Sequence, residues 1–205
     1  MSLSELATSR WGRTVGDLVP AGLWFWFAWR HLEKYLERGG LVTLVFVAAE
    51  TLAVLLFLVR KPARTVAPNG LAWAIGIAGT AAPLLFTPTY VVVYEPLTAF
   101  APFGAFLMVA GLASLNRSFG IVAANREIKT RGLYRVVRHP IYMSYVFLYT
   151  GYLFANWSPT NLAIFATLLA AIALRVIEEE KLLSQDPEYR AYMDRVRWRI
   201  LPLVY

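Results

Sequence analysis

The sequence predicts an all-α, polytopic membrane protein with about six transmembrane helices, a C-terminal helical hairpin and a tail helix at the membrane surface. Of its 205 residues, 58% are hydrophobic and 16% are charged, whereas a soluble domain carries about 25% charged residues. The apolar residues also form long blocks, and about 20 of them span a bilayer as a helix. Blocks without any charged residue cover 65–94, 96–116 and 140–174.

Six segments are expected to cross the membrane, and five helices are the alternative. The third segment contains Pro83 and Pro88, which are expected to kink its helix. Only residues 156–159 separate the last two segments, and so short a linker predicts an antiparallel helical hairpin. The segments are 17–29 with an extension to 36, 41–59, 71–93, 97–115, 140–155 and 160–177.

The positions of the 20 Lys and Arg residues predict the orientation in the membrane. With the N-terminus inside, three of them (Arg30, Lys34 and Arg38) fall on the outer side, which leaves 17 on the inner side. Positive residues concentrate in cytoplasmic loops, so both termini are expected to be cytoplasmic. This placement assigns the net charge of +7 to contact with membrane lipids and argues against nucleic acid. The chain has no cysteine, which excludes disulfides and thiolate metal sites, and no metal is expected.

The C-terminal tail is predicted to contain a short helix that lies along the membrane surface. Asp186 and Pro187 are typical of a helix start, because Asp caps free N–H groups and Pro suits the first helical position. Apolar side chains then follow at helical spacing, at Tyr189, Tyr192, Met193 and Val196. We expect this helix to fold over the cytoplasmic mouth of the protein.

The basic segment 131–142 is the first candidate for a functional site. His139-Pro140 begins the fifth helix, because proline is favoured in the first helical turn. The free N–H groups of a helix start attract anions, and Arg135 and Arg138 add positive charge. The alternative is that the arginines of this segment only contact lipid head groups.

The acidic triplet Glu178, Glu179 and Glu180 is the second candidate, because it closes the sixth helix. Acidic residues are unfavourable at a helix C-terminus, and a local violation of this kind often marks function. The alternative is a solvated extension of the helix. The predicted hairpin brings His139 close to the triplet, so that a basic helix start faces an acidic helix end. A zwitterionic, sulfonium-bearing cofactor such as S-adenosylmethionine matches both sides.

These motifs, in this order, resemble the isoprenylcysteine carboxyl methyltransferase family and the related phospholipid N-methyltransferases. The resemblance comprises the segment 131–142, the apolar hairpin, the Glu-Glu pair and the Glu-Tyr-Arg-Ala-Tyr motif at 188–192. The Asn-Arg-Ser-Phe-Gly-Ile stretch at 116–121 suits bacterial members, and therefore the bacterial inner membrane. The resemblance divides the chain into N-terminal transmembrane helices at 1–111, for substrate access or as a scaffold, and a methyltransferase core at 112–205.

The resemblance implies a cytoplasmic pocket for S-adenosylmethionine, closed by the tail, with a lipophilic substrate that enters sideways from the bilayer. Arg138 is implied to orient the methyl acceptor. Glu178 is the alternative member of the acidic pair and, for an amine acceptor, a candidate base. A carboxylate acceptor needs mainly positioning and desolvation. The implied cofactor contacts are Gly132, Leu133, Tyr134, His139, Tyr142, Glu179 and Glu180.

Glu50 is a further candidate, because an ionisable residue in the middle of an apolar segment is rare and often functional. It can serve the substrate or pair with a polar group on a neighbouring helix, while His31 is expected to be a surface residue near the outer face. Two other functions stay open at this point. One is an NADPH-dependent, sterol-reductase-like oxidoreductase, and the other is a non-enzymatic membrane scaffold or transporter. The sequence does not define the oligomeric state.

Overall fold

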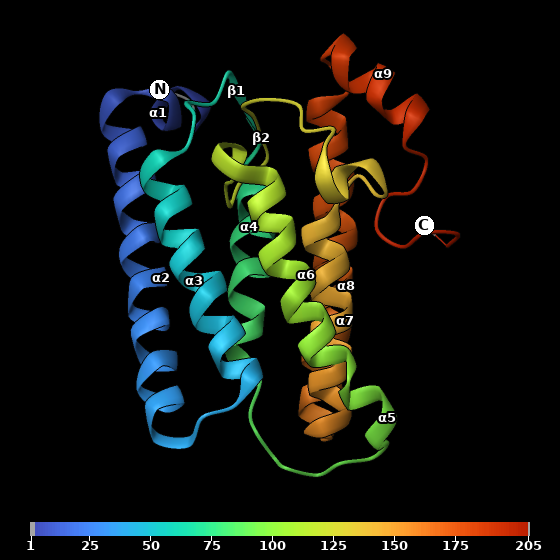
Figure 1. Ribbon diagram of the computed structural model, residues 1–205. Helices are drawn as coiled ribbons and strands as arrows, with labels where there is room; N and C mark the ends of the chain where they lie inside the picture. Colours follow the sequence, from blue (N-terminus) through green and yellow to red (C-terminus); the bar gives the residue numbers. More distant parts are fainter. Residues whose placement is uncertain (1–2, 205) are drawn as a thin grey trace.

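The computed structural model describes residues 3–204 and confirms the all-α fold (Figure 1). The helices are α1 Leu3–Thr8, α2 Arg10–Arg38, α3 Leu41–Val59, α4 Gly70–Ala81, α5 Glu95–Thr98, α6 Phe100–Leu115, α7 Pro140–Ala155, α8 Pro159–Leu183 and α9 Pro187–Arg195. Three short 3-10 helices are η1 Ala82–Leu85, η2 Asn116–Ser118 and η3 Gly132–Arg135. Two antiparallel strands complete the described part of the chain, β1 Thr65–Val66 and β2 Ala124–Asn125.

Within residues 3–204, three helical stretches are long and apolar enough to cross a membrane. They are Leu41–Val59, Glu95–Ser118 and Pro159–Leu183, and the apolar stretch Gly70–Leu85 is shorter. The predicted hairpin is present, because α7 and α8 pack against each other across the short linker. Helix α8 continues to Leu183, so the acidic triplet lies inside its last turns and does not end it.

The expectation of one kinked helix at 71–93 is wrong. Helix α4 ends at Ala81, Pro83 lies in the 3-10 turn η1, and the chain then runs without regular structure to residue 94. Proline lacks the N–H that would continue a helix, and both Pro83 and Pro88 lie where the helix was expected. The segment must therefore satisfy its backbone groups elsewhere.

Two asparagines of the hairpin linker region supply these partners. Asn161 is fully buried, and its Nδ2 donates to the carbonyl of Thr87 (2.8 Å). The Oδ1 of Asn156 accepts from the backbone N–H of Thr89 (3.1 Å). Further along, the N–H of Val93 donates to the carbonyl of Phe154 (3.1 Å). Contacts from the distant hairpin thus replace the hydrogen bonds that a helix would have provided.

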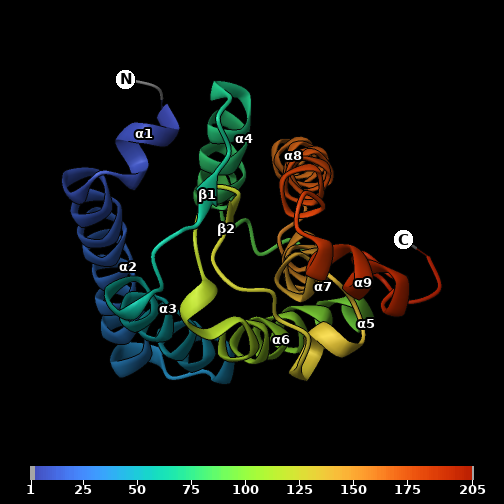
Figure 2. The same cartoon turned by 90° about the horizontal axis from the view of Figure 1, so that it is seen from above.

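Helices α2, α3, α4, α6 and α7 surround an interior cavity. Helix α2 packs on α3, α3 on α6, and α6 on α7, while α4 packs on α8 (Figure 2). Helices α6 and α7 approach closely at two glycines. An added Cβ at Gly104 would lie 2.2 Å from the backbone N of Leu148, and one at Gly151 would lie 2.1 Å from that of Ala101. Small residues permit such contact between membrane helices, and here they set the position of α7.

The predicted tail helix is present as α9, and Asp186 caps it by accepting from the backbone N–H of Glu188 (2.9 Å). After α9 the chain returns to the start of α7. The N–H groups of Arg138 and His139 donate to the carbonyls of Trp198 (2.9 Å) and Arg199 (2.8 Å). The tail therefore uses the donors of these two residues, which sequence reasoning had assigned to an anionic ligand. The location of α9 at a membrane surface stays a prediction.

Candidate functional site

The three consecutive glutamates of α8 meet three different environments, because successive residues of a helix point about 100° apart. Glu178 is partly exposed and accepts a hydrogen bond from Asn69 Nδ2 (3.2 Å). Glu179 lines a polar cavity between α7, α8, the 118–129 loop and the tail. Glu180 is buried in an ionic cluster with residues of α7 and the tail.

The Glu180 cluster attaches the tail to the hairpin. Arg138 donates to Glu180 from Nε (2.7 Å) and Nη2 (3.4 Å), and its Nη1 donates to the carbonyl of Val196 (3.2 Å). Arg199 Nε donates to Glu180 Oε2 (2.9 Å). The Arg138 and Glu180 side chains are each only 7% exposed. Buried charges of this kind must be paired, so this cluster holds the tail in place.

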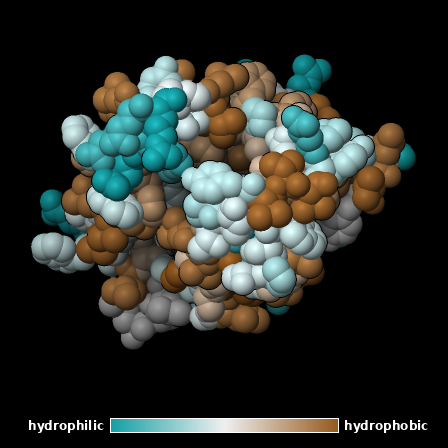
Figure 3. Space-filling model, turned by 90° about the horizontal axis from the view of Figure 1, so that it is seen from below, coloured by the Kyte–Doolittle hydropathy of each residue, from teal (hydrophilic) through white to brown (hydrophobic). Residues whose placement is uncertain are grey.

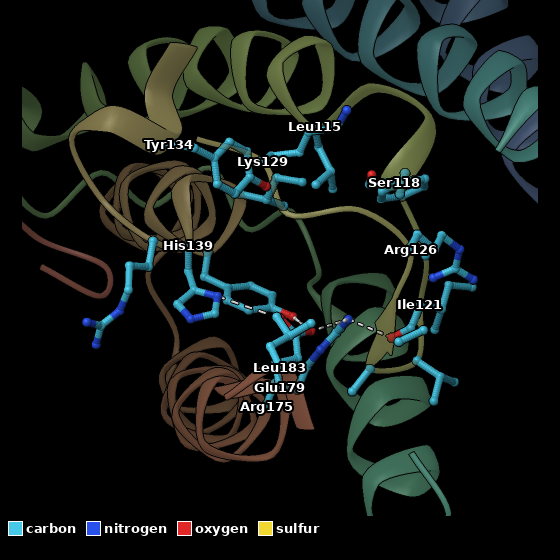
Figure 4. Close-up of a pocket in the computed structure, with 18 of the residues that line it drawn as sticks. Leu115, Ser118, Ile121, Arg126, Lys129, Tyr134, His139, Arg175, Glu179 and Leu183 are labelled. Carbon is cyan, nitrogen blue, oxygen red and sulfur yellow. Dashed lines mark hydrogen bonds and ion pairs between the residues drawn. The ribbon is translucent and has the colours of Figure 1, made fainter. Parts of the chain in front are cut away.

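Glu179 is the carboxylate that is available inside the polar cavity (Figure 4). The hydroxyl of Tyr142 donates to its Oε1, and His139 Nδ1 lies 3.6 Å from its Oε2. Arg175 Nη2 lies 3.9 Å away, one helical turn earlier on α8. The site therefore combines the Glu179 carboxylate with donors that keep it oriented, and the second carboxylate that lines the cavity, Glu127, is paired with Lys129 (2.8 Å).

His139 connects the two glutamates. Its Nε2 lies 3.2 Å from Glu180 Oε1, while its Nδ1 faces Glu179. Burial favours the neutral ring, but the hydrogen bonds with Glu179 and Glu180 outweigh it and raise the pKa of His139 above its usual range. The ring therefore carries positive charge between two carboxylates over a wider pH range than a free histidine.

Three tyrosines form an aromatic wall of the cavity: Tyr134, Tyr189 and Tyr192. Burial raises the pKa of all three hydroxyls, so each is a neutral donor at physiological pH. Tyr192 donates to the carbonyl of Tyr134 (2.8 Å). The buried Tyr189 hydroxyl has no hydrogen-bond partner within residues 3–204. A buried polar group without a partner is costly, and a ligand in the cavity can satisfy it.

Tyr134 is positioned by the 3-10 helix η3, which starts at Gly132. The φ of Gly132 is +62°, and an added Cβ would lie 2.4 Å from Ser114 Oγ. Both facts require glycine at this position. Gly132 and its neighbour Leu133 do not line the cavity, and their predicted contact with the cofactor stays a prediction.

The donor set of the polar cavity fits S-adenosylmethionine. Glu179 and the tyrosine faces suit an ammonium or sulfonium group. Arg126 and Lys129, which lie across the cavity from Glu179, suit a carboxylate, and Lys129 also pairs with Glu127 (2.8 Å). The cavity volume is about 140 Å³, below the roughly 300–1,000 Å³ usual for ligand pockets. Binding of a ligand of this size therefore requires the side chains that line the cavity to rearrange.

A second, apolar cavity of about 520 Å³ lies against the first. Helices α2, α3, α4, α6 and α7 all contribute to its wall, which contains Glu50. Contrary to expectation, His31 is not confined to the surface: it lines this cavity and pairs with Glu50. The two cavities have six lining residues in common, at Trp24, Thr80, Phe119, Ile121, Ile141 and Tyr145.

The structure thus places only part of the predicted site in the polar cavity. Tyr134, His139, Tyr142, Glu179 and Arg138 line it. Glu178 and Glu180 do not, because Glu178 contacts Asn69 and Glu180 lies in the ionic cluster, and their predicted roles as base and cofactor contact stay predictions. The guanidinium of Arg138 is held by Glu180, and its role in orienting the acceptor stays a prediction.

Arg175 is the main residue that sequence reasoning missed. It is buried and donates to the carbonyls of Ile121 (2.7 Å) and Gly76 (3.3 Å). Its guanidinium also lies over the ring of Tyr142, 5.2 Å from the centroid. A signal was present, because Arg175 is the only charged residue in 140–177 and precedes Glu179 by one turn.

Fold and site together define a membrane protein that places a charged-ligand site next to an apolar cavity. Residues 78–186 match the model of a family described as Phospholipid methyltransferase. The match covers more than half of the chain, so the protein belongs to the phospholipid methyltransferase family of membrane enzymes. This family transfers methyl groups to lipid-related acceptors and generally uses S-adenosylmethionine. No curated protein and no solved structure matches the chain.

Membership of this family favours the methyltransferase prediction over the oxidoreductase and the scaffold. The matched region begins on α4, well before the resemblance at 112–205, and it ends at Asp186, before the tail helix. It therefore includes α8 with Glu179 and Glu180, but not the tail tyrosines that close the cavity.

Proposed function

We propose that this protein methylates a lipophilic acceptor, with S-adenosylmethionine bound in the polar cavity and the acceptor in the apolar one. The observation that carries the proposal is the shared wall between the two cavities. A methyl donor and its acceptor must meet in line at close distance, and two adjoining cavities, one with several charged side chains and one largely apolar, provide such a meeting place.

The polar cavity has a separate group for each end of the cofactor. We assign the ammonium group to Glu179 and the aromatic wall, and the carboxylate to Lys129 and Arg126. The unpaired hydroxyl of Tyr189 is available to the nucleoside part. When bound, S-adenosylmethionine supplies an electrophilic methyl group on its sulfonium.

The junction of the two cavities, formed by the six lining residues that they share, favours an acceptor that is already a nucleophile. The six shared residues include no carboxylate and no histidine, so the titratable group at the junction itself is the phenol of Tyr145, a poor base while it is protonated. A carboxylate acceptor needs no base, since it reacts once it is positioned and freed from water. We therefore place a lipophilic carboxylic acid ahead of a phospholipid amine as the acceptor.

The same proposal sets the orientation and the substrate route. We place the α9 end at the cytoplasmic face of a bacterial inner membrane, on the support of the Lys and Arg distribution. The acceptor then reaches the apolar cavity from the bilayer, while the water-soluble cofactor binds from the opposite, polar side. Membrane lipids surround the helices in this arrangement.

Calorimetric titration of the detergent-solubilised protein with S-adenosylhomocysteine tests the cofactor half of the proposal. Saturable binding is expected, and the Glu179→Gln variant should lose most of the affinity. Glu178→Gln is the matched control, because this neighbouring carboxylate lies outside the cavity. Lack of binding at millimolar ligand would overturn the assignment of the cofactor.

Transfer of radiolabelled methyl groups from S-adenosylmethionine into a total lipid extract tests the acceptor half. The labelled product should be a base-labile methyl ester if the acceptor is a carboxylic acid. A label that resists mild alkali and stays with a phospholipid head group would show an amine acceptor instead.

A further inference from the structure

Glu50 and His31 form a polar pair in the wall of the apolar cavity. His31 Nδ1 lies 2.9 Å from Glu50 Oε2, and the two side chains are 32% and 13% exposed. The imidazole ring also stacks on Phe46, with centroids 5.2 Å apart and an interplanar angle of 13°. The pair therefore has a defined orientation and connects α2 to α3.

An ionisable pair in such surroundings needs a reason, because polar groups are costly to remove from water. Linking two helices is one reason, but that link uses only part of the hydrogen-bonding capacity of the imidazole and the carboxylate. Within residues 3–204, the recorded hydrogen bond occupies Nδ1 of the ring and one carboxylate oxygen. Nε2 of His31 and Oε1 of Glu50 have no protein partner there, and both residues line the cavity. The pair can thus serve a ligand inside the cavity.

The distance of the pair from the junction follows from helix geometry. Trp24 lines both cavities, and His31 lies seven residues further along α2. Seven residues at 1.5 Å each place the pair about 10 Å from the junction along the helix axis. Apolar and aromatic side chains, including Phe27, Ala53 and Met108, line the cavity wall.

We infer that the acceptor carries an uncharged hydroxyl about 10 Å from its methyl-accepting group, and that Glu50 and His31 bind this hydroxyl. This inference rests on the proposed function and narrows its substrate class. When Nε2 carries a hydrogen, a hydroxyl can accept from it and donate its own hydrogen to the carboxylate, and when Nε2 carries none, the hydroxyl can donate to Nε2 or to the carboxylate. A charged group would have to be desolvated and would suit only one protonation state of the pair.

The far end of the apolar cavity also adjoins a polar surface. His31 and Lys34 line both the apolar cavity and a surface depression formed with Arg30, Glu33, Glu37 and Arg38. Seen from the end opposite α9, the molecule shows a hydrophilic patch beside largely hydrophobic surface (Figure 3). An acceptor with polar groups at both ends and an apolar body between them matches this sequence of environments.

Equilibrium dialysis of the full, detergent-solubilised chain with two radiolabelled probes tests the inference. The probes are decanoic acid and its ω-hydroxy derivative, each with saturating S-adenosylhomocysteine. We expect the hydroxy acid to bind about tenfold more tightly, which corresponds to about 1.4 kcal/mol. Glu50→Leu and His31→Phe should each abolish this preference while leaving S-adenosylhomocysteine affinity unchanged. Glu33→Gln, a change at the surface depression, should retain the preference.

Each outcome has a defined meaning. Three results would overturn the inference: equal affinity for the two acids, failure of both acids to bind, or a preference that survives both variants. In each case, binding of S-adenosylhomocysteine would still support the proposed function. Failure of S-adenosylhomocysteine to bind would count against the proposed function itself. If Glu50→Leu does not fold, the comparison of the two acids on the unaltered protein still decides, and Glu50→Gln provides a variant of unchanged size.

Discussion

Replacing Glu178, Glu179 and Glu180 by glutamine, one at a time, separates binding from stability at three adjacent positions. Each substitution keeps the side-chain size and removes one negative charge. The environments differ sharply: a partly exposed contact with Asn69, the polar cavity, and a buried ionic cluster. The same chemical change should therefore give three different results.

The expected magnitudes follow from these environments. Glu178→Gln should stay within about 0.5 kcal/mol of the original stability, as is usual for surface changes. Glu179→Gln should cost about 1.5–3 kcal/mol of cofactor binding, the range for hydrogen bonds to charged groups, which is a loss of roughly 10- to 150-fold in affinity. Glu180→Gln leaves Arg138 buried without its anion, which costs about 3–5 kcal/mol of folding stability.

Two assays on each variant distinguish these effects: thermal unfolding in detergent and titration with S-adenosylhomocysteine. A loss of 3–5 kcal/mol should lower the unfolding midpoint of Glu180→Gln by roughly 10 °C, since about 1 kcal/mol shifts a protein of this size by 2–4 °C. Loss of binding in Glu178→Gln with normal binding in Glu179→Gln would refute the assignment of the carboxylates.

Three further predictions follow from the same contacts. Because the pKa of His139 is raised in the folded protein, its charge adds folding stability that is fully present below about pH 6.5. This stability is lost as the pH rises through the raised pKa. The difference in unfolding midpoint between the unaltered protein and His139→Gln should therefore shrink towards alkaline pH. Gly104→Ala should cost about 1–3 kcal/mol through overpacking of α6 on α7, whereas Gly22→Ala, which meets no neighbour within 4 Å, should leave the unfolding midpoint unchanged or raise it. Gly132→Ala should strain the turn before Tyr134 and weaken S-adenosylhomocysteine binding in titration, and unchanged affinity would show that this turn does not shape the cavity.

Local signals in the sequence were sufficient to predict the hairpin and its polar end. Pro140 after His139 marked the start of α7, and the short linker required α8 to return beside it. The charges on the two helix ends then had to lie close together. The family resemblance was confirmed by the match at 78–186, which contains the segment 131–142, the hairpin and the Glu-Glu pair but not the motif at 188–192.

Features that depend on distant partners were not predictable. Which glutamate lines the cavity depends on how far α8 continues and on its rotation, and neither is encoded by the triplet alone. The segment after Pro83 is irregular because Asn156 and Asn161, far along the chain, satisfy its backbone. Likewise, Glu50 was recognised as unusual, but its partner His31 was expected at the outer surface.

The arrangement of charges around His139 explains how one short segment can both fix the tail and shape the ligand site. The ring contacts Glu180, which belongs to the tail-fixing cluster, and Glu179, which belongs to the cavity. The tail in turn contributes Tyr189 and Tyr192 to the cavity wall. The tail therefore helps to exclude water around Glu179, and electrostatic interactions strengthen when water is excluded. Because the ionic cluster of Glu180 holds the tail, the stability of this cluster and the shape of the cavity around Glu179 depend on the same contacts.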